Sequence, residues 1–256
     1  MDVWGWSGNQ VELEFINASD PANLSLEEKL TIDGNLVSSR RVGDSLYLVT
    51  RYTPFIGGYT NYALDESTRQ ANDLLLTEAS LTTLVPKLEM PDREPLDLIE
   101  SQNCFMATSA VDINRNPTII TITTIPLSDP SAFASTCYLG NSETMYMTPQ
   151  SLFLATTQNQ YTILAPDALV YDPEHRTAIH KFSIADRGVS YSGSGEVRGH
   201  LGWSEDKRSF RMGAGGEDDN YLNVVTSIGD TWGVYFKYSP YGAQGGWQST
   251  RDCRLY

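Results

Sequence analysis

Glu196 and His200 come nearest to acid/base chemistry by residue type and spacing. They lie four residues apart, and with Asp186 or Asp206 they could form an acid/base pair, because histidine titrates near neutral pH. Ser194 stands close by between two glycines but lacks the G-x-S-x-G spacing of a hydrolase elbow. That serine is typical of a bend or bulge in a strand. We therefore expect no catalytic residue here, with Glu196 and His200 as the alternative.

A second pattern concerns metal binding. Asp112, Asn114 and Asn116 have the D-x-N-x-N spacing that turns alternate oxygens toward one cation, as in calcium loops. Pro117 occupies the place where such loops need glycine, and Ile122 stands where the closing glutamate belongs. We expect an Asx-rich turn, with calcium as the alternative and no other cofactor.

The remaining candidate ligands are histidines and a short acidic run. His175, His180 and His200 match no helical metal motif, and His180 lies in a predicted strand, where a structural role is expected. Residues 217–220 (EDDN) could gather oxygens, but a solvated hairpin turn is the preferred interpretation. The tryptophans at 4, 6, 203, 232 and 247 could stack on sugars or peptides, or pack between strands.

The cysteines allow one disulfide. Cys104, Cys137 and Cys253 form no C-x-x-C pair, which disfavours zinc and thioredoxin-type sites. A bond between Cys104 and Cys137 would stabilise the fold by about 2–4 kcal/mol if the geometry fits. Three free thiols remain the alternative.

Composition limits the partners. The chain has 256 residues, with 18 basic and 32 acidic side chains and a net charge of −14. Such a field repels a phosphate backbone, so nucleic acid is not an expected partner. No apolar run reaches the roughly 18 residues of a membrane span. The first ten residues lack the basic and apolar regions of a signal peptide, so an exported protein would be represented here by its mature or excised part.

Residues 118–157 predict four short strands. Ile119, Ile120, Ile122 and Ile125 are interspersed with threonines, and β-branched side chains suit a pleated surface. Turn signals follow about every ten residues with no helical period. This pattern is typical of an all-β protein.

The same order of strands and turns recurs on both sides of this stretch. From a turn aspartate to a terminal threonine, three modules run over 20–50, 129–156 and 186–226. Four-stranded units of this size indicate the antiparallel blades of a β-propeller, with each sequence module beginning in mid-blade. We expect a propeller-like array of about three blades, incomplete as a ring. A β-sandwich with coincidental turn similarity is the alternative.

Two segments interrupt the modules of this single domain of residues 1–256. Residues 51–117 form an insertion with helix formers between 65 and 84, expected to pack as short helices on the propeller. An amphipathic partner-binding helix is the alternative. Residues 235–256 lose the strand pattern and form an irregular tail. Unclosed blades leave exposed edges, which predicts either a fragment of a longer chain or self-association through those edges.

Four motifs stand out along the chain: SSRRVGDSLYLVTRYTP (38–54), TIITITTIPLSDP (118–130), LGNSETMYMTPQSLFLATT (139–157) and TAIHKFSIADRGVSYSGSGEVRGHL (177–201). In this order they resemble a known family, the secreted bacterial and archaeal beta-propeller domain proteins of largely unassigned function. With their spacing they cover most of the chain from about 11 to 231, and the chain departs from the family after Gly233. The resemblance implies an exported propeller and carries over no catalytic residues.

The expected function is therefore an exported, non-catalytic propeller that binds or scaffolds a protein, peptide or glycan. One alternative is an extracytoplasmic hydrolase that uses carboxylates and a histidine at the blade rims. The other is a structural component of a larger assembly.

Overall fold

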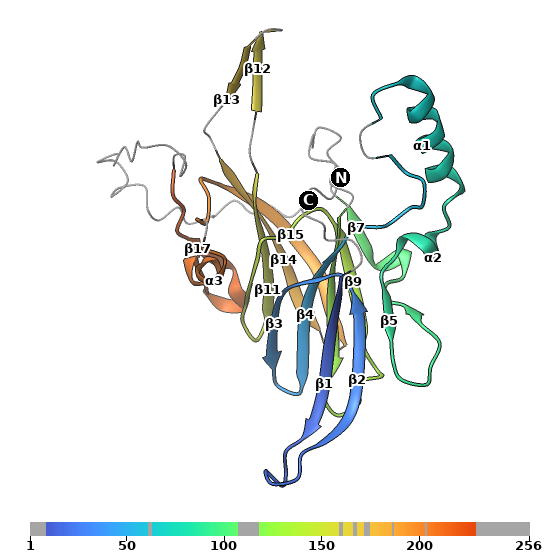
Figure 1. The fold of residues 1–256 in the computed structure, drawn as a ribbon. Coiled ribbons are helices and arrows are strands. Elements are labelled where there is room, and N and C mark those ends of the chain that lie inside the picture. The colour runs from blue at the N-terminus through green and yellow to red at the C-terminus, as the bar shows by residue number, and fades with distance from the viewer. Residues whose placement is uncertain are drawn as a thin grey trace. The chain divides into compact units, whose positions relative to one another are not determined.

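The computed structural model describes residues 9–60, 63–106, 118–158, 161–165, 168–171, 175–185, 187–202 and 204–228. These residues form antiparallel sheets with a few short helices, which confirms the all-β prediction (Figure 1). The chain divides into two compact units, Met1–Asn141 and Ser142–Tyr256. None of the described helices is long and apolar enough to cross a membrane.

The first unit contains two sheets. Its elements are β1 (Gln10–Asn17), β2 (Ser25–Asp33), β3 (Asn35–Val42), β4 (Ser45–Tyr52), α1 (Glu66–Glu78), α2 (Leu81–Leu84), β5 (Lys87–Glu89), β6 (Leu96–Asp97), the 3₁₀ turn η1 (Ser101–Asn103), β7 (Cys104–Met106), β8 (Ile119–Pro126) and β9 (Ala134–Leu139). The strand orders are β1-β2-β5-β6 and β3-β4-β8-β9-β7. All of these pairings are antiparallel except that of β7 with β9, which is parallel.

The second unit contains one four-stranded sheet and two hairpins. Its elements are β10 (Thr144–Met147), β11 (Ser151–Gln158), β12 (Tyr161–Ala165), β13 (Ala168–Tyr171), β14 (Arg176–Ala185), β15 (Gly188–Arg198), α3 (Glu205–Arg208), η2 (Ser209–Arg211), β16 (Met212–Gly215), η3 (Glu217–Asp219) and β17 (Tyr221–Val224). The sheet runs β10-β11-β14-β15, while β12-β13 and β16-β17 each form a two-stranded pair.

The predicted modules correspond to β1–β4, β8–β11 and β14–β17. Each consists of two hairpins, and the two hairpins belong to different sheets: β8-β9 pairs with β3-β4, whereas β10-β11 pairs with β14-β15. A sheet is thus completed by the second hairpin of one module and the first hairpin of the next. This arrangement is the expected offset between sequence repeat and blade.

One strand boundary in the third module was wrong. The sequence predicts a strand at 209–212, but Ser209–Arg211 continues the turn of α3 as η2, and the strand begins at Met212. The reason is local: the N–H of Met212 bonds to the carbonyl of Ser209, closing the 3₁₀ turn before the strand starts.

The core of the first unit lies between its two sheets. Leu30 and Ile32 of β2 are fully buried and share one apolar cluster with Leu48 of β4, Ile125 of β8 and Leu88 of β5. Strand β8 is buried at nearly every position, on both of its faces. Continuous burial explains why its sequence is so uniformly β-branched.

The second unit has its own core. Ile179 and Val197 of the four-stranded sheet pack with Met212, Leu222 and Val224 of the β16-β17 hairpin. Strand β17 alternates between exposed and buried residues, so one of its faces covers the sheet. Hydrophobic burial therefore attaches this hairpin to the sheet.

Helix α1 departs from the sequence prediction. Asp65 caps its first turn, and hydrogen bonds from the Ser67 hydroxyl and the Thr68 N–H lower the pKa of Asp65 to about 2. The sequence suggested that leucines would pack the helix against the strands, but Leu74 is 63% exposed and Asn72 is the buried residue. The Asn72 amide accepts from the Thr60 N–H at 2.9 Å and donates to the Thr60 carbonyl at 2.8 Å. Asn72 therefore anchors the helix through polar contacts, and the leucines of α1 are at most partly buried.

Candidate functional site

His200 lies just beyond β15 and is buried. Its main chain pairs with that of Ser227, and its Nδ1 accepts a hydrogen bond from the Gly202 N–H at 3.0 Å. The ring of His175, also buried, meets it edge-to-face with the centroids 5.3 Å apart. Because Nδ1 is an acceptor, that nitrogen carries no proton in this arrangement.

Glu196 has a different environment. Its carboxylate lies 3.6 Å from the guanidinium of Arg176 on the neighbouring strand, and about half of its side chain is exposed. An exposed ion pair of this kind contributes about 0–1 kcal/mol. Neither aspartate suggested by the sequence is seen to join Glu196 and His200. Asp206 is exposed on α3, and Asp186 lies outside the described residues. Glu196 is thus bound to Arg176, while His200 is enclosed with His175.

His180 occupies the middle of β14 and is 8% exposed. Its Nδ1 lies 3.3 Å from the Tyr191 hydroxyl, and Tyr191 in turn packs edge-to-face on Phe182. Burial lowers the pKa of His180 to about 4, because an apolar surrounding disfavours the charged imidazolium. The ring is neutral at physiological pH, as suits a core residue.

The acidic run at 217–220 binds the side-chain amine of Lys181. The Lys181 amine donates to the carbonyl oxygens of Asp218 and Asp219, each at 3.0 Å, and the Thr148 hydroxyl donates to the Asp219 carboxylate. Lys181 reaches this turn across the ring of Phe153. The turn is therefore fixed to the sheet by a lysine, a partner that the sequence pattern did not reveal.

Arg208 is a second residue whose role the sequence pattern did not reveal. Its side chain is buried, with the guanidinium 3.7 Å from the Glu143 carboxylate and its Nε donating to the Gly202 carbonyl at 2.9 Å. Removing the Glu143 carboxylate would be costly, because it takes an acidic partner away from a buried guanidinium. Charge patterning gives no signal for it, because the two residues are far apart in sequence.

The calcium site suggested by the sequence stays a prediction. Asp112, Asn114 and Asn116 lie outside the described residues. Within the described part of the chain, no group of three or more histidine, cysteine, aspartate or glutamate side chains is arranged to hold a metal ion. The five tryptophans also lie outside that part.

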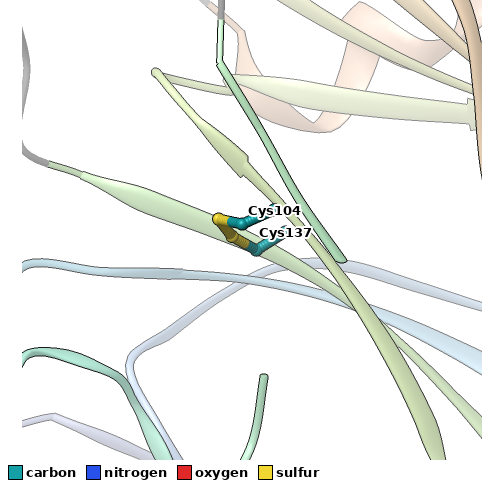
Figure 2. The surroundings of a disulfide bond; sticks show 2 residues. All are labelled: Cys104 and Cys137. Atoms are coloured by element: carbon teal, nitrogen blue, oxygen red, sulfur yellow. A yellow bond between two sulfur atoms is a disulfide. The ribbon is translucent and has the colours of Figure 1, made fainter. Parts of the chain in front are cut away.

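In the structure Cys104 and Cys137 are joined as a disulfide, the first of the two alternatives left open by the sequence (Figure 2). They face each other in the parallel pairing of β7 with β9, with the Cα atoms 4.4 Å apart. Cys137 is fully buried in the core of the first unit. The bond fastens a three-residue strand to the edge of the sheet.

Strand β1 lies at one of the sheet edges of the first unit. It pairs with β2 on one side, and among the described residues no strand pairs with its other side (Figure 1). Its side chains alternate between exposed positions, including Glu12 and Glu14, and half-buried positions such as Leu13. The sequence does predict this half-exposed strand from its Val/Glu/Leu/Glu/Phe alternation, but not that it lies at an edge.

One family matches the chain. The family model described as "Beta propeller domain" matches residues 4–252. No curated protein and no solved structure matches the chain at a significant level.

Proposed function

Because the chain belongs to the beta propeller domain family, we propose that it is an exported, non-catalytic propeller module that binds or scaffolds a protein, peptide or glycan ligand. The observation that carries the proposal is the edge of β1, where backbone hydrogen-bonding groups and alternating side chains are accessible. Sheet edges of this kind recognise extended segments of other chains.

The arrangement of the titratable groups supports a binding role. Catalysis by the Glu196–His200 pair requires the two side chains to share a proton path. Instead, Glu196 engages Arg176, and Nδ1 of His200 accepts from a backbone N–H. These contacts hold the strands together and leave both groups poorly placed for proton transfer to a substrate.

The disulfide supports export. Structural disulfides persist in oxidising compartments and are rare in the reducing cytosol. The Cys104–Cys137 bond joins two residues that are 33 positions apart in the sequence, and it lies against the core. It therefore stabilises the folded state. Alkylation of the native protein without reductant should leave these two cysteines unlabelled, with labelling only after reduction.

The binding role is tested with the full chain on arrays of immobilised 15-residue peptides and of glycans. We expect saturable binding to one ligand class, with a dissociation constant of roughly 1–100 µM. Heat-denatured chain is the control for nonspecific adhesion. Absence of saturable binding by a chain that shows a native circular dichroism spectrum would overturn the proposal. Hydrolysis of an array ligand that is lost in Glu196→Gln would favour the hydrolase instead.

A further inference from the structure

The backbone of β1 presents a regular set of hydrogen-bonding groups with which no strand of the described residues pairs. In the antiparallel pair with β2, the Gly34 N–H donates to the Asn9 carbonyl at 2.7 Å, which sets the phase of the ladder. Hydrogen-bonded residues alternate with residues whose N–H and C=O point away from the partner strand. Gln10, Glu12 and Glu14 are therefore the residues of β1 whose backbone groups face the open edge.

The outer face of this hairpin is negatively charged. Glu12 and Glu14 project from β1 beside Asp33 of β2, and Lys29 is the one basic side chain opposite them, 2.9 Å from Glu12. The hydrogen bond with Glu12, together with the charges of Glu12 and Glu14, raises the pKa of Lys29. With these three carboxylates and one amine, the face carries two more negative than positive charges.

The inner face of the same strand is apolar. Val11, Leu13 and Phe15 are half-buried and pack against the core cluster that contains Leu30 and Ile32. A strand added beside β1 would place every second side chain next to these three residues, because side chains alternate across a sheet. The edge thus offers carboxylates on one face and an extension of the core on the other.

We propose that the edge of β1 binds an extended peptide segment in which basic residues alternate with apolar ones. The segment adds as a strand to Gln10, Glu12 and Glu14, with its basic side chains beside the two glutamates and its apolar side chains beside Leu13. The inference rests on the proposed binding function and names its ligand class and its site. Charge complementarity supplies the specificity, and the backbone ladder supplies most of the affinity.

A second copy of the chain is the less suitable occupant. Antiparallel pairing of β1 with its own copy places Glu12 opposite Glu12 when centred on that residue, and Glu12 opposite Glu14 when centred on Leu13. Like charges directly opposite each other across a strand pair are destabilising. The acidic alternation that favours a basic ligand therefore opposes self-pairing.

The test measures binding of a fluorescent, acetylated and amidated peptide, KVKIKVK, to the full chain. We expect a dissociation constant of roughly 10–100 µM at low salt, weakening several-fold when about 0.5 M NaCl is added. The scrambled peptide KKVIVKK has the same charge and composition without the alternation, and EVEIEVE has the alternation with opposite charge. Both should bind at least roughly tenfold more weakly.

Two variants of Glu12 separate the contribution of its backbone N–H to peptide binding from that of its carboxylate. Glu12→Pro removes a backbone N–H that points away from β2, so β1 keeps its pairing within the chain but loses a central donor. Glu12→Thr is the matched control, because it removes the same carboxylate and the same ion pair while keeping the donor. We expect KVKIKVK to bind Glu12→Thr a few-fold more weakly than the parent chain, and Glu12→Pro at least roughly tenfold more weakly than Glu12→Thr. Matching thermal midpoints of the two variants show that both are folded.

Three results would overturn the inference: equal binding of KVKIKVK and KKVIVKK, equal binding by Glu12→Pro and Glu12→Thr, or a stable dimer in light scattering that dissociates in Glu12→Pro. Any of these can occur while the arrays still show a specific ligand, so the binding function can hold when the β1 site fails.

Discussion

The environment of each side chain, more than its type, decides what it does in this protein. All three histidines of the chain lie between 175 and 200, and the structure buries every one of them. In sequence they are candidates for proton transfer, but in the fold His180 is a core residue and His200 closes a turn with Gly202. Likewise, Lys181 binds the acidic turn that could have attracted a metal ion.

Burial of His180 predicts a loss of stability in mild acid. Its pKa is about 4 in the folded protein against 6.5 when unperturbed, so the unfolded chain takes up the proton first as the pH falls. The stability present above pH 6.5 is therefore lost progressively down to about pH 4, by an amount on the order of 3 kcal/mol. Urea unfolding from pH 7.5 to 4.5 measures this loss, which should be absent in His180→Phe. Parallel pH profiles of the two proteins would contradict the assignment.

Two threonines on the same face of β8 offer a matched test of buried hydroxyl groups. Thr121 and Thr123 are both fully buried, but the Oγ1 of Thr121 has no hydrogen-bond partner among the described residues, whereas that of Thr123 accepts from the Ser135 hydroxyl at 3.3 Å. Thr121→Val should stabilise the protein by about 1 kcal/mol or be neutral, because it removes an unpaired polar group without changing the shape. Thr123→Val should destabilise it by about 1 kcal/mol. Chemical denaturation of both variants decides, and equal effects would contradict the distinction.

At the scale of elements, the hairpin is the unit that the sequence encodes. The strands of the three modules could be predicted because period-two patterns and turn residues are local signals. Strands β5, β6 and β7 could not, because each has two or three residues and exists through its pairing with a distant strand. The hairpin β12-β13 was also missed. The division of each module between two sheets was predicted from the offset between repeat and blade, but the strand that each short strand pairs with is not written in a single segment. Of the candidate site, the alternation of β1 was predictable and its position at an edge was not.

Helix α1 gives a prediction at this scale. A helix of 13 residues is marginal by itself, and α1 is held through the amide of Asn72 on the backbone of Thr60. Asn72→Ala should leave both Thr60 groups unpaired and raise the hydrogen exchange of the α1 amides by roughly tenfold or more. The exposed neighbour Asp73 provides the control, because Asp73→Ala removes no such contact. Unchanged exchange in Asn72→Ala would show that other contacts hold the helix.

At the scale of the whole molecule, the two units are stabilised by different chemistry. The disulfide belongs to Met1–Asn141, where Cys137 joins the core cluster. The buried histidines and the ion pair of the buried Arg208 with the partly exposed Glu143 belong to Ser142–Tyr256. Reductant and acid should therefore act on different halves of the chain.

Reduction is the cleaner perturbation, because it changes one bond. Opening a loop that spans a separation of 33 residues should cost the first unit about 3–4 kcal/mol through the greater entropy of its unfolded state. We expect reductant at pH 7.5 to accelerate hydrogen exchange in β3, β4, β8 and β9 and to leave β11, β14 and β15 unchanged. The double variant Cys104→Ser, Cys137→Ser should reproduce this pattern without reductant, whereas Cys253→Ser should not. Equal acceleration in both sets of strands would mean that the units unfold as one, and that the disulfide stabilises the chain as a whole.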